Sequence, residues 1–322
     1  FEKPERYAFL DSEPDIASVL RIRLETAVDP TSGVWNFQRL RVYLDGVVGT
    51  TFELLEVLLD GAADVCVQDP NNARMPLSRG ARVLPVGFGE HEDVLPYPAT
   101  AHDGYRILQE FAAFPEKFLF VDLEGLCIES NAKAVDLLVL LRRRVDIPIT
   151  AHNLKLGCTP VTNLFQKPSE PIRITQQQPE YLLQPDLHRE RVTEIFSIEN
   201  VNAVSAVDGK AYEVQPFFSY THEATAPNAR RAYWTVRREP SFNGDVPGTR
   251  TWMSFLDLDF NPVMPPTDVI YATVTCTNRD LAAQIPAGSK VENDSELAGS
   301  NIHLLTRPSL PIDAPVDGDS YW

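Results

Sequence analysis

The sequence predicts a β-rich α+β protein with mixed or antiparallel sheets, a few short helices and long proline-containing loops. Several segments alternate apolar and polar residues with the period of two that a half-buried strand requires. Two segments change to the apolar spacing of a helix. The chain also holds 26 prolines among 322 residues, which favours ordered loops between strands over a compact helical scaffold.

The first 68 residues predict the order strand, strand, helix, strand. The two opening strands alternate cleanly, and the second turns at Asp45-Gly46. The helix follows from three apolar residues at helical spacing, a threonine cap and a terminal glycine. The predicted elements are the strands 20–28, 39–46 and 63–69 and the helix 50–61, with Thr50 or Thr51 as cap, Phe52, Leu55 and Leu59 on one face and Gly61 at the end.

Residues 69–102 are loop-rich, and a second short helix follows them. Asp103 can cap this helix at Gly104, and Pro115 ends it because a proline ring clashes with the preceding turn. Its apolar residues are expected to face the core. They are Ile107, Leu108 and Phe111.

Two apolar segments after this helix predict interior strands. Residues 117–123 (KFLFVDL) are apolar on both faces, which is typical of a buried strand. Residues 134–144 (AVDLLVLLRRR) fit a strand or a helix, and the early stop at Asp146 and Pro148 favours the strand. Four phenylalanines lie in this part of the chain, and we expect them to wedge the helix against a sheet inside the fold: Phe111, Phe114, Phe118 and Phe120.

The second half of the chain predicts a sandwich- or barrel-like lobe. After an extended proline- and glutamine-rich stretch, short strands are expected at 193–204, 232–240, 251–260 and 268–278. We therefore expect two lobes, a mixed strand and helix lobe at 1–165 and a β-rich lobe at 166–322. The acidic end, residues 308–322, reads as a linker toward a further domain, and the chain is expected to be a piece of a longer one.

Charge and cysteine spacing exclude several classes of function. The net charge of −16 disfavours nucleic acids and anionic membranes as partners, since both require a basic surface. No apolar run approaches the roughly 18 residues of a membrane span, so we expect no direct membrane insertion. The four cysteines lie far apart, without a nearby histidine pair, which is poor spacing for zinc.

The residues that could carry chemistry are individually weak candidates. His91 stands in an acidic loop, and His188 could act as a base held by Asp186. Asp257 and Asp259 would lie about 7 Å apart on one face of a strand, and paired carboxylates perform acid–base work in hydrolases. Cys276 could be a nucleophile if a base lay nearby. A β-rich hydrolase using the paired carboxylates is therefore the alternative hypothesis, and a solvated strand face is the simpler reading.

Three stretches together give a more specific indication. They are GYRILQEFAAFPEKFLFVDLEGL at 104–126, LGCTPVTNLFQKPSEPIRI at 156–174 with Pro185-Asp186 after it, and CTNRDLAAQIP at 276–286. Their order and spacing, with VGF and LPYP just upstream, resemble the TssF family, also called ImpG or VasA, of the bacterial type VI secretion system. The resemblance spans roughly residues 20–310.

This resemblance implies a structural role in a baseplate wedge, without catalytic residues or cofactors. It implies TssG, a second TssF, TssE and TssK as partners around the VgrG hub, in the cytoplasm at the inner membrane. Large obligate interfaces are rich in apolar and aromatic residues, so exposed loop aromatics are candidate contacts. These candidates, for which core packing is the competing explanation, are Phe165, Phe217, Phe218, Tyr220 and Trp234.

Overall fold

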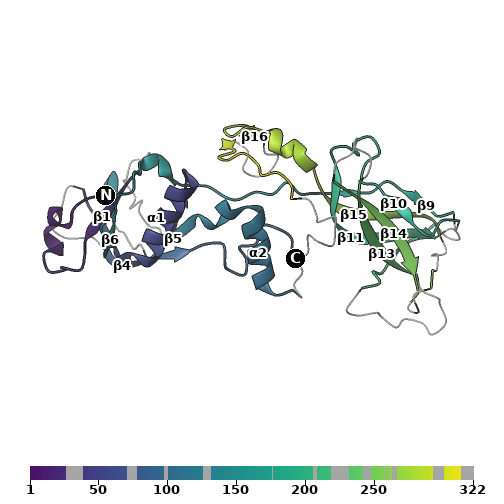
Figure 1. Ribbon diagram of the computed structural model, residues 1–322, viewed down its shortest axis with the longest axis horizontal. Helices are drawn as coiled ribbons and strands as arrows, with labels where there is room; N and C mark the ends of the chain where they lie inside the picture. The colour runs from purple at the N-terminus through teal and green to yellow at the C-terminus, as the bar shows by residue number, and fades with distance from the viewer. Residues whose placement is uncertain are drawn as a thin grey trace. The chain divides into compact units, whose positions relative to one another are not determined.

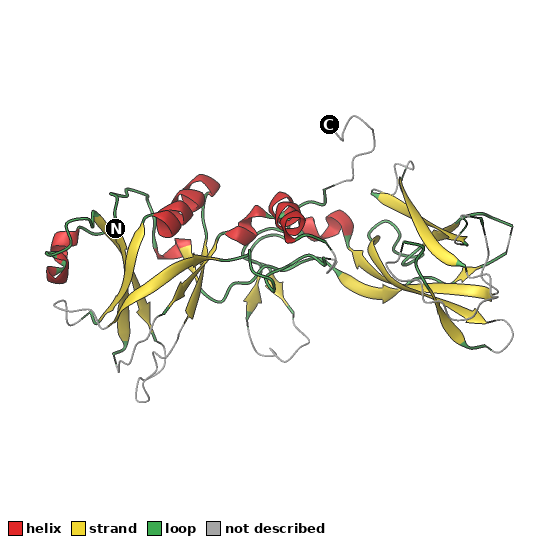
Figure 2. Cartoon of the chain, turned by 90° about the horizontal axis from the view of Figure 1, so that it is seen from below, coloured by secondary structure: helices red, strands yellow, loops and turns green. Residues whose placement is uncertain are grey.

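The computed structural model divides the chain into two compact units, Phe1–Thr162 and Asn163–Trp322. Strands dominate in both, with few helices (Figures 1 and 2). The expected β-rich fold with antiparallel sheets is thus confirmed. The structure describes residues 1–26, 39–70, 78–97, 101–125, 132–175, 177–205, 209–218, 232–241, 248–257, 259, 261–262, 267–292 and 301–312.

Unit 1 is built on a seven-stranded antiparallel sheet in the order β1-β6-β3-β4-β5-β2-β7. In the described part of this unit, two α-helices and four short 3₁₀ helices connect or cover these strands. The strands are β1 (Ser18–Glu25), β2 (Arg39–Leu44), β3 (Ala62–Gln68), β4 (Ser78–Pro85), β5 (Phe120–Glu124), β6 (Ala134–Leu141) and β7 (Leu154–Lys155); the helices are α1 (Val48–Asp60), α2 (Asp103–Ala113), η1 (Pro4–Arg6), η2 (Ala8–Leu10), η3 (Pro115–Phe118) and η4 (Ala151–Asn153).

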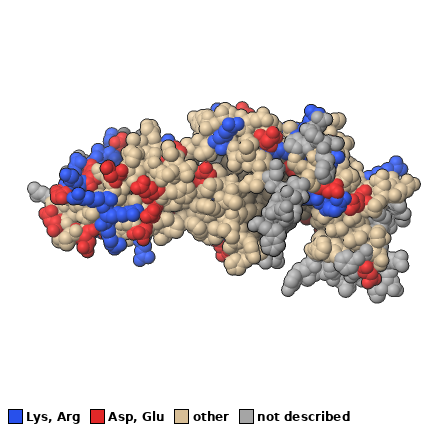
Figure 3. All heavy atoms as spheres, in the orientation of Figure 1, with Lys and Arg blue, Asp and Glu red and all other residues tan. Residues whose placement is uncertain are grey.

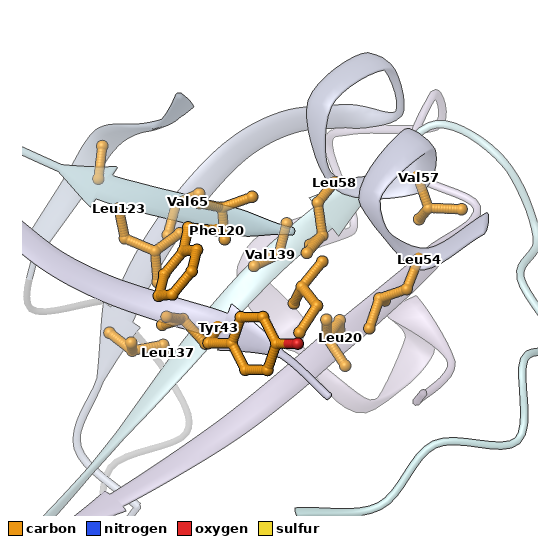
Figure 4. Close-up of a cluster of buried hydrophobic side chains, with 14 of the residues drawn as sticks. Leu20, Tyr43, Leu54, Val57, Leu58, Val65, Phe120, Leu123, Leu137 and Val139 are labelled. Carbon is orange, nitrogen blue, oxygen red and sulfur yellow. The ribbon is translucent and has the colours of Figure 1, made fainter. Parts of the chain in front are cut away.

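The interior strand β6 is buried on both faces, which explains its continuous apolar sequence. Leu137, Val139 and Leu141 enter the main core, while Leu138 and Leu140 pack against the N-terminal 3₁₀ helices. Figure 4 shows the side chains of α1 meeting those of the strands in the main core. The preference for a strand at this segment, and the interior position of β5, are confirmed.

Two carboxylates are buried in the sheet and are neutralised by arginines on neighbouring strands. Asp136 on β6 accepts hydrogen bonds from Arg23 on β1 at 2.8 and 3.0 Å. Asp122 on β5 accepts from Arg41 on β2 at 2.9 and 2.8 Å. Bidentate arginine pairs of this kind compensate the cost of burying a carboxylate and also fix the register of adjacent strands.

Helix α1 packs on the sheet, and of its predicted apolar face Phe52 and Leu55 are partly buried against the main core. Its buried residues are Thr51, Leu54, Val57 and Leu58, whereas Leu59 is exposed. The predicted threonine cap is wrong. The helix begins earlier, after Val47, so the Thr51 hydroxyl lies inside the first turn and donates to the Val47 and Val48 carbonyls. Gly61 follows the last helical residue, as predicted.

Strand β4 lies in the stretch that was expected to be loop. Its sequence, SRGARVLP, carries a glycine with φ of +87° and ends on a proline, and only Ala81 is buried. Neither apolar alternation nor β-branched content marks such a strand. It forms because β3 and β5 provide hydrogen-bonding edges on its two sides.

Among the described residues, unit 2 contains two antiparallel sheets that share one core and a separate two-stranded sheet, β16-β17. The first has the order β10-β14-β13, and the second β12-β11-β15-β8, with β9 also pairing with β15. Residues of both sheets form one buried cluster, so the sheets pack face to face as in a sandwich. The elements are β8 (Phe165–Pro168), β9 (Ile172–Arg173), β10 (Tyr181–Leu183), β11 (Glu194–Ser205), β12 (Ala211–Val214), β13 (Tyr233–Pro240), β14 (Thr249–Leu256), β15 (Thr267–Thr277), η5 (Arg279–Gln284), β16 (Lys290–Val291) and β17 (Ile302–His303).

Within the described ranges, no helix combines the length and hydropathy needed to cross a membrane.

Candidate interaction surfaces

The paired carboxylates expected on one strand do not form a catalytic pair. Strand β14 ends at Leu256, and Asp257 then organises a turn. Its Oδ1 accepts hydrogen bonds from the backbone N–H groups of Asp259 and Asn261, both at 2.9 Å. The strand stops here because Met253 and Phe255 are fully buried, and the next residue on that face would place a carboxylate in the core. Residues 258 and 260 lie outside the described residues.

The histidine candidates have no catalytic geometry. The carboxylate of Asp186 pairs with Lys167 Nζ at 2.8 Å and accepts from the backbone N–H groups of His188 and Arg189, so it stabilises a turn and does not orient the His188 imidazole. His91 is exposed. In the part of the chain that the structure describes, no group of three or more metal-ligating side chains comes together.

The Cys276 thiol is buried in β15 and is not poised as a nucleophile. Desolvation raises its pKa to about 11, so it remains protonated at neutral pH. A thiol of this kind is inert, because the thiolate is the reactive form. The hydrolase hypothesis therefore gains no support from any of its candidate residues.

Three of the five aromatic candidates meet on unit 2. The backbone N–H of Phe217 donates to the Trp234 carbonyl at 2.8 Å, and Phe217 and Phe218 stack edge to face with centroids 5.1 Å apart. Phe217 is buried, while Phe218 is 83% exposed. Trp234 packs partly on the core. Phe165 does not join them, because it lies on β8 opposite Cys276, and Tyr220 lies outside the described residues.

Residues 163–174 of the second stretch that carries the family resemblance lie beside the third stretch in unit 2. Strand β8 pairs with β15, and Asn278 Nδ2 donates to Asn163 Oδ1 at 2.9 Å. The buried Arg279 follows with a φ of +48°, pairs with Glu194 at 3.4 Å and donates to the Thr193 carbonyl. Asn163, Asn278 and Arg279 thus join strand ends within the sandwich.

The surface that sequence reasoning missed lies on helix α2 of unit 1. The helix was expected to bury its apolar face, and this prediction is wrong. Leu108 is 68% exposed and Phe111 is 51% exposed, whereas Arg106 and Glu110 are buried. Of the four phenylalanines expected inside, Phe118 and Phe120 are buried, Phe114 is half-buried and Phe111 lies at the surface.

A buried ion cluster holds α2 in this orientation. Glu110 is 2% exposed, pairs with the Lys117 ammonium of η3 and accepts from the backbone N–H groups of Val94 and Leu95 at 2.6 and 3.1 Å. Desolvation would raise the pKa of Glu110, but these hydrogen bonds and the Lys117 charge outweigh it and lower the pKa. The carboxylate is therefore charged at neutral pH and ties the helix to the 86–97 loop.

Arginine and lysine complete the cluster by binding the same loop. Arg106 Nη2 donates to the Gly89 carbonyl at 3.1 Å, and Lys117 Nζ donates to the Gly87 carbonyl at 3.3 Å. Glu92 closes the loop from within by accepting from the Gly87 and Gly89 N–H groups at 2.7 and 3.0 Å. The cap was also misplaced, since His102, and not Asp103, accepts from the Gly104 N–H at 3.0 Å.

The local sequence contains the signal for this arrangement but does not decide it. Arg106 and Glu110 stand four residues apart on one side of the helix, and Tyr105, Leu108 and Phe111 on the other. Such a helix is amphipathic whichever side faces the protein. Lys117 is the deciding group, because it sits in the next element and needs a buried acidic partner.

Comparisons with known proteins agree on one family. The family described as "Type VI secretion system, TssF" matches residues 2–322. The chain is 28% identical over 331 residues to the type VI secretion system component TssF1 of Pseudomonas aeruginosa, covering 97% of this chain and 53% of that protein.

Among solved structures, the chain resembles one from the type VI secretion system TssK-TssF-TssG baseplate subcomplex, with a TM-score of 0.73 and 26% identity. That match covers 96% of this chain and 57% of the other. The chain thus spans little more than half the length of these relatives. With the family match extending over nearly every residue, the chain belongs to the TssF family of the type VI secretion system.

Proposed function

We propose that the protein is a structural subunit of the type VI secretion baseplate wedge that supports assembly of the sheath and tube. The main support for this proposal is the structural match of 96% of this chain to a chain of a TssK-TssF-TssG baseplate subcomplex. TssG and TssK are accordingly its first partners. A second copy of the chain, TssE and the VgrG hub complete the assembly, which would form in the cytoplasm against the inner membrane.

The proposed role is non-catalytic, and the positions of the candidate reactive groups support it. Asp257 organises a turn, Asp186 binds a lysine and backbone amides, and the pKa of Cys276 is raised by burial. These contacts support a protein that works by shape and contact.

Exposed aromatics of unit 2 are proposed to contact partner subunits. Phe218 is the strongest of them because its ring is 83% exposed and is braced by the buried Phe217. Phe165, Tyr220 and Trp234 belong to the same proposal. We also propose that the lobes 1–165 and 166–322 engage partners as separate parts of the wedge.

Co-expression of the native full-length chain with TssG and TssK from the same genome tests this function. Affinity purification followed by native mass spectrometry should give a stable complex with two copies of this chain for each TssG. A chain that purifies alone, with neither protein bound, would contradict the wedge assignment. Phe218→Ser serves as the interface variant, with Leu187→Ser, 58% exposed in the same unit, as its matched control.

A further inference from the structure

Four apolar side chains form a surface platform on unit 1: Phe88, Tyr105, Leu108 and Phe111. Their exposed fractions are 51%, 72%, 68% and 51%. The buried ring of Phe118 packs against two of them, with centroid distances of 5.0 Å to Phe88 and 5.8 Å to Phe111. The surface around α2 is a broad uncharged area in Figure 3. Contiguous exposed apolar surface of this kind marks interaction sites on soluble proteins.

The platform is held in place by buried charged side chains, where stability alone would favour apolar ones. Burying a charged cluster under an apolar surface stabilises a protein no better than packing apolar side chains there. Helix α2 instead buries the charged Arg106 and Glu110 and leaves the apolar Leu108 and Phe111 in solvent. The arrangement makes sense if the apolar face is itself needed.

The loop that carries Phe88 is also fixed before any partner binds. Gly87 has a φ of +103°, and a Cβ at this position would come within 3.1 Å of the Phe118 ring. Arg41 extends the bracing by donating to Glu92 at 2.9 Å. A rigid, preformed surface loses little conformational entropy on association, which favours affinity.

The two segments that carry the platform are acidic, and their charge indicates what binds it. Residues 86–97 and 101–118 contain six acidic side chains and two basic ones, and both basic ones, Arg106 and Lys117, are buried against Glu110. Glu90, Asp93 and Asp103 are exposed and make no ion pair within the described residues. A second copy would bring an identical acidic border, and each chain carries a net charge of −16. Self-association through this face is therefore disfavoured.

We propose that the platform docks a different protein, whose contacting surface is apolar at its centre and bordered by lysine or arginine. The proposal rests on the assembly role proposed above, which supplies heterologous partners. The exposed aromatic rings would be the central contacts, since aromatic side chains surrounded by a polar rim dominate binding energy at such interfaces.

The test replaces the apolar helix face with glutamine, which keeps helix propensity: Tyr105→Gln, Leu108→Gln and Phe111→Gln together, in the native full-length chain. The probes are TssG and TssK from the same genome, co-expressed with it. We expect at least tenfold less of one of them to be retained, and weaker retention by the wild type as salt increases, because the border is charged. The matched control is Leu156→Gln with Val161→Gln, 54% and 68% exposed, which should retain wild-type amounts.

The outcomes separate this inference from the proposed function. If the wild type retains TssG or TssK and the triple variant retains as much, the docking surface is wrong while the baseplate role stands. If the wild type retains neither, both are wrong. A wild-type dimer that the triple variant abolishes in sedimentation would show a second copy as the occupant and overturn the choice of partner. A large drop in the melting temperature of the triple variant would show that this face is covered by its own chain. That result would also overturn the proposed docking surface.

Discussion

The two α-helices of unit 1 have similar lengths and are both amphipathic, yet they pack in opposite senses. Helix α1 places Leu54, Val57 and Leu58 against the sheet. Helix α2 places Arg106 and Glu110 inward and leaves Leu108 and Phe111 outside. The difference shows that apolar periodicity defines two faces of a helix, while the surrounding elements decide which face is buried.

The largest effect expected around α2 comes from the ring beneath the platform. Phe118 is 5% exposed and contacts both Phe88 and Phe111. Phe118→Ala should lower the free energy of unfolding by about 3–5 kcal/mol, because it removes a buried aromatic ring and leaves a cavity. Chemical denaturation measures this, with Phe118→Leu as the milder control. An unchanged midpoint would contradict burial of this ring.

A leucine on each helix tests the contrast directly. Leu54 of α1 is 1% exposed, and Leu54→Ala should cost about 3 kcal/mol. Leu108 of α2 is 68% exposed, and Leu108→Ala should change stability by less than about 0.5 kcal/mol. Denaturant midpoints of the two variants give the comparison. Equal losses would mean that α2 also buries its apolar face.

The inward face of α2 predicts a dependence of stability on pH, because it buries a carboxylate, whereas the buried side chains of α1 are a threonine and three aliphatic residues. The pKa of Glu110 is lowered in the folded protein, so its stabilising contribution is complete above the carboxyl's ordinary value of 4.5 and is lost as pH falls through the lowered value. Glu110→Gln should therefore cost about 2 kcal/mol at neutral pH, the scale of hydrogen bonds to a buried charge.

The same variant should approach wild-type stability in acid, because the wild-type carboxyl is then protonated and, like glutamine, uncharged. Thermal unfolding between pH 7 and pH 3 records this convergence. Glu92, whose pKa is also lowered, remains in the variant and accounts for some acid sensitivity that both proteins share. A stability difference that stays constant over the range would show that Glu110 is not charged in the folded protein.

Much of the fold follows from local pattern, and the exceptions have physical causes. The apolar run at 134–141 predicts an interior strand because both faces of β6 meet core side chains. Strand β4 could not be predicted, since it depends on hydrogen-bonding edges from β3 and β5 and not on its own side chains. The early end of β14 could not be predicted either, because it depends on the buried cluster that Phe255 enters, which the sequence does not reveal.

The interaction surface was harder to predict than the fold. The orientation of α2 depends on the contacts of Glu110 with Lys117 and with the backbone amides of residues 94 and 95. No periodic pattern in the sequence links these three groups. Hydrophobicity alone assigned Phe111 to the core. A search for buried partners of isolated lysines near apolar helices would have pointed to the correct face.

The smallest effect expected concerns how the two helices begin. The α1 N-terminus has no side-chain cap, and Val47 occupies the cap position in an extended conformation, 77% exposed. Val47→Ser should therefore stabilise the protein by about 0.5–1 kcal/mol, because the hydroxyl can accept from a free backbone N–H of the first turn.

In α2 that role is filled by the His102 ring, and His102→Ala should cost a similar amount. Melting temperatures would record shifts of opposite sign, with Val47→Ala as the control for lost apolar area. A loss of stability in both variants would mean that the first turn of α1 depends on the Val47 side chain, and that its start, unlike that of α2, is fixed by packing.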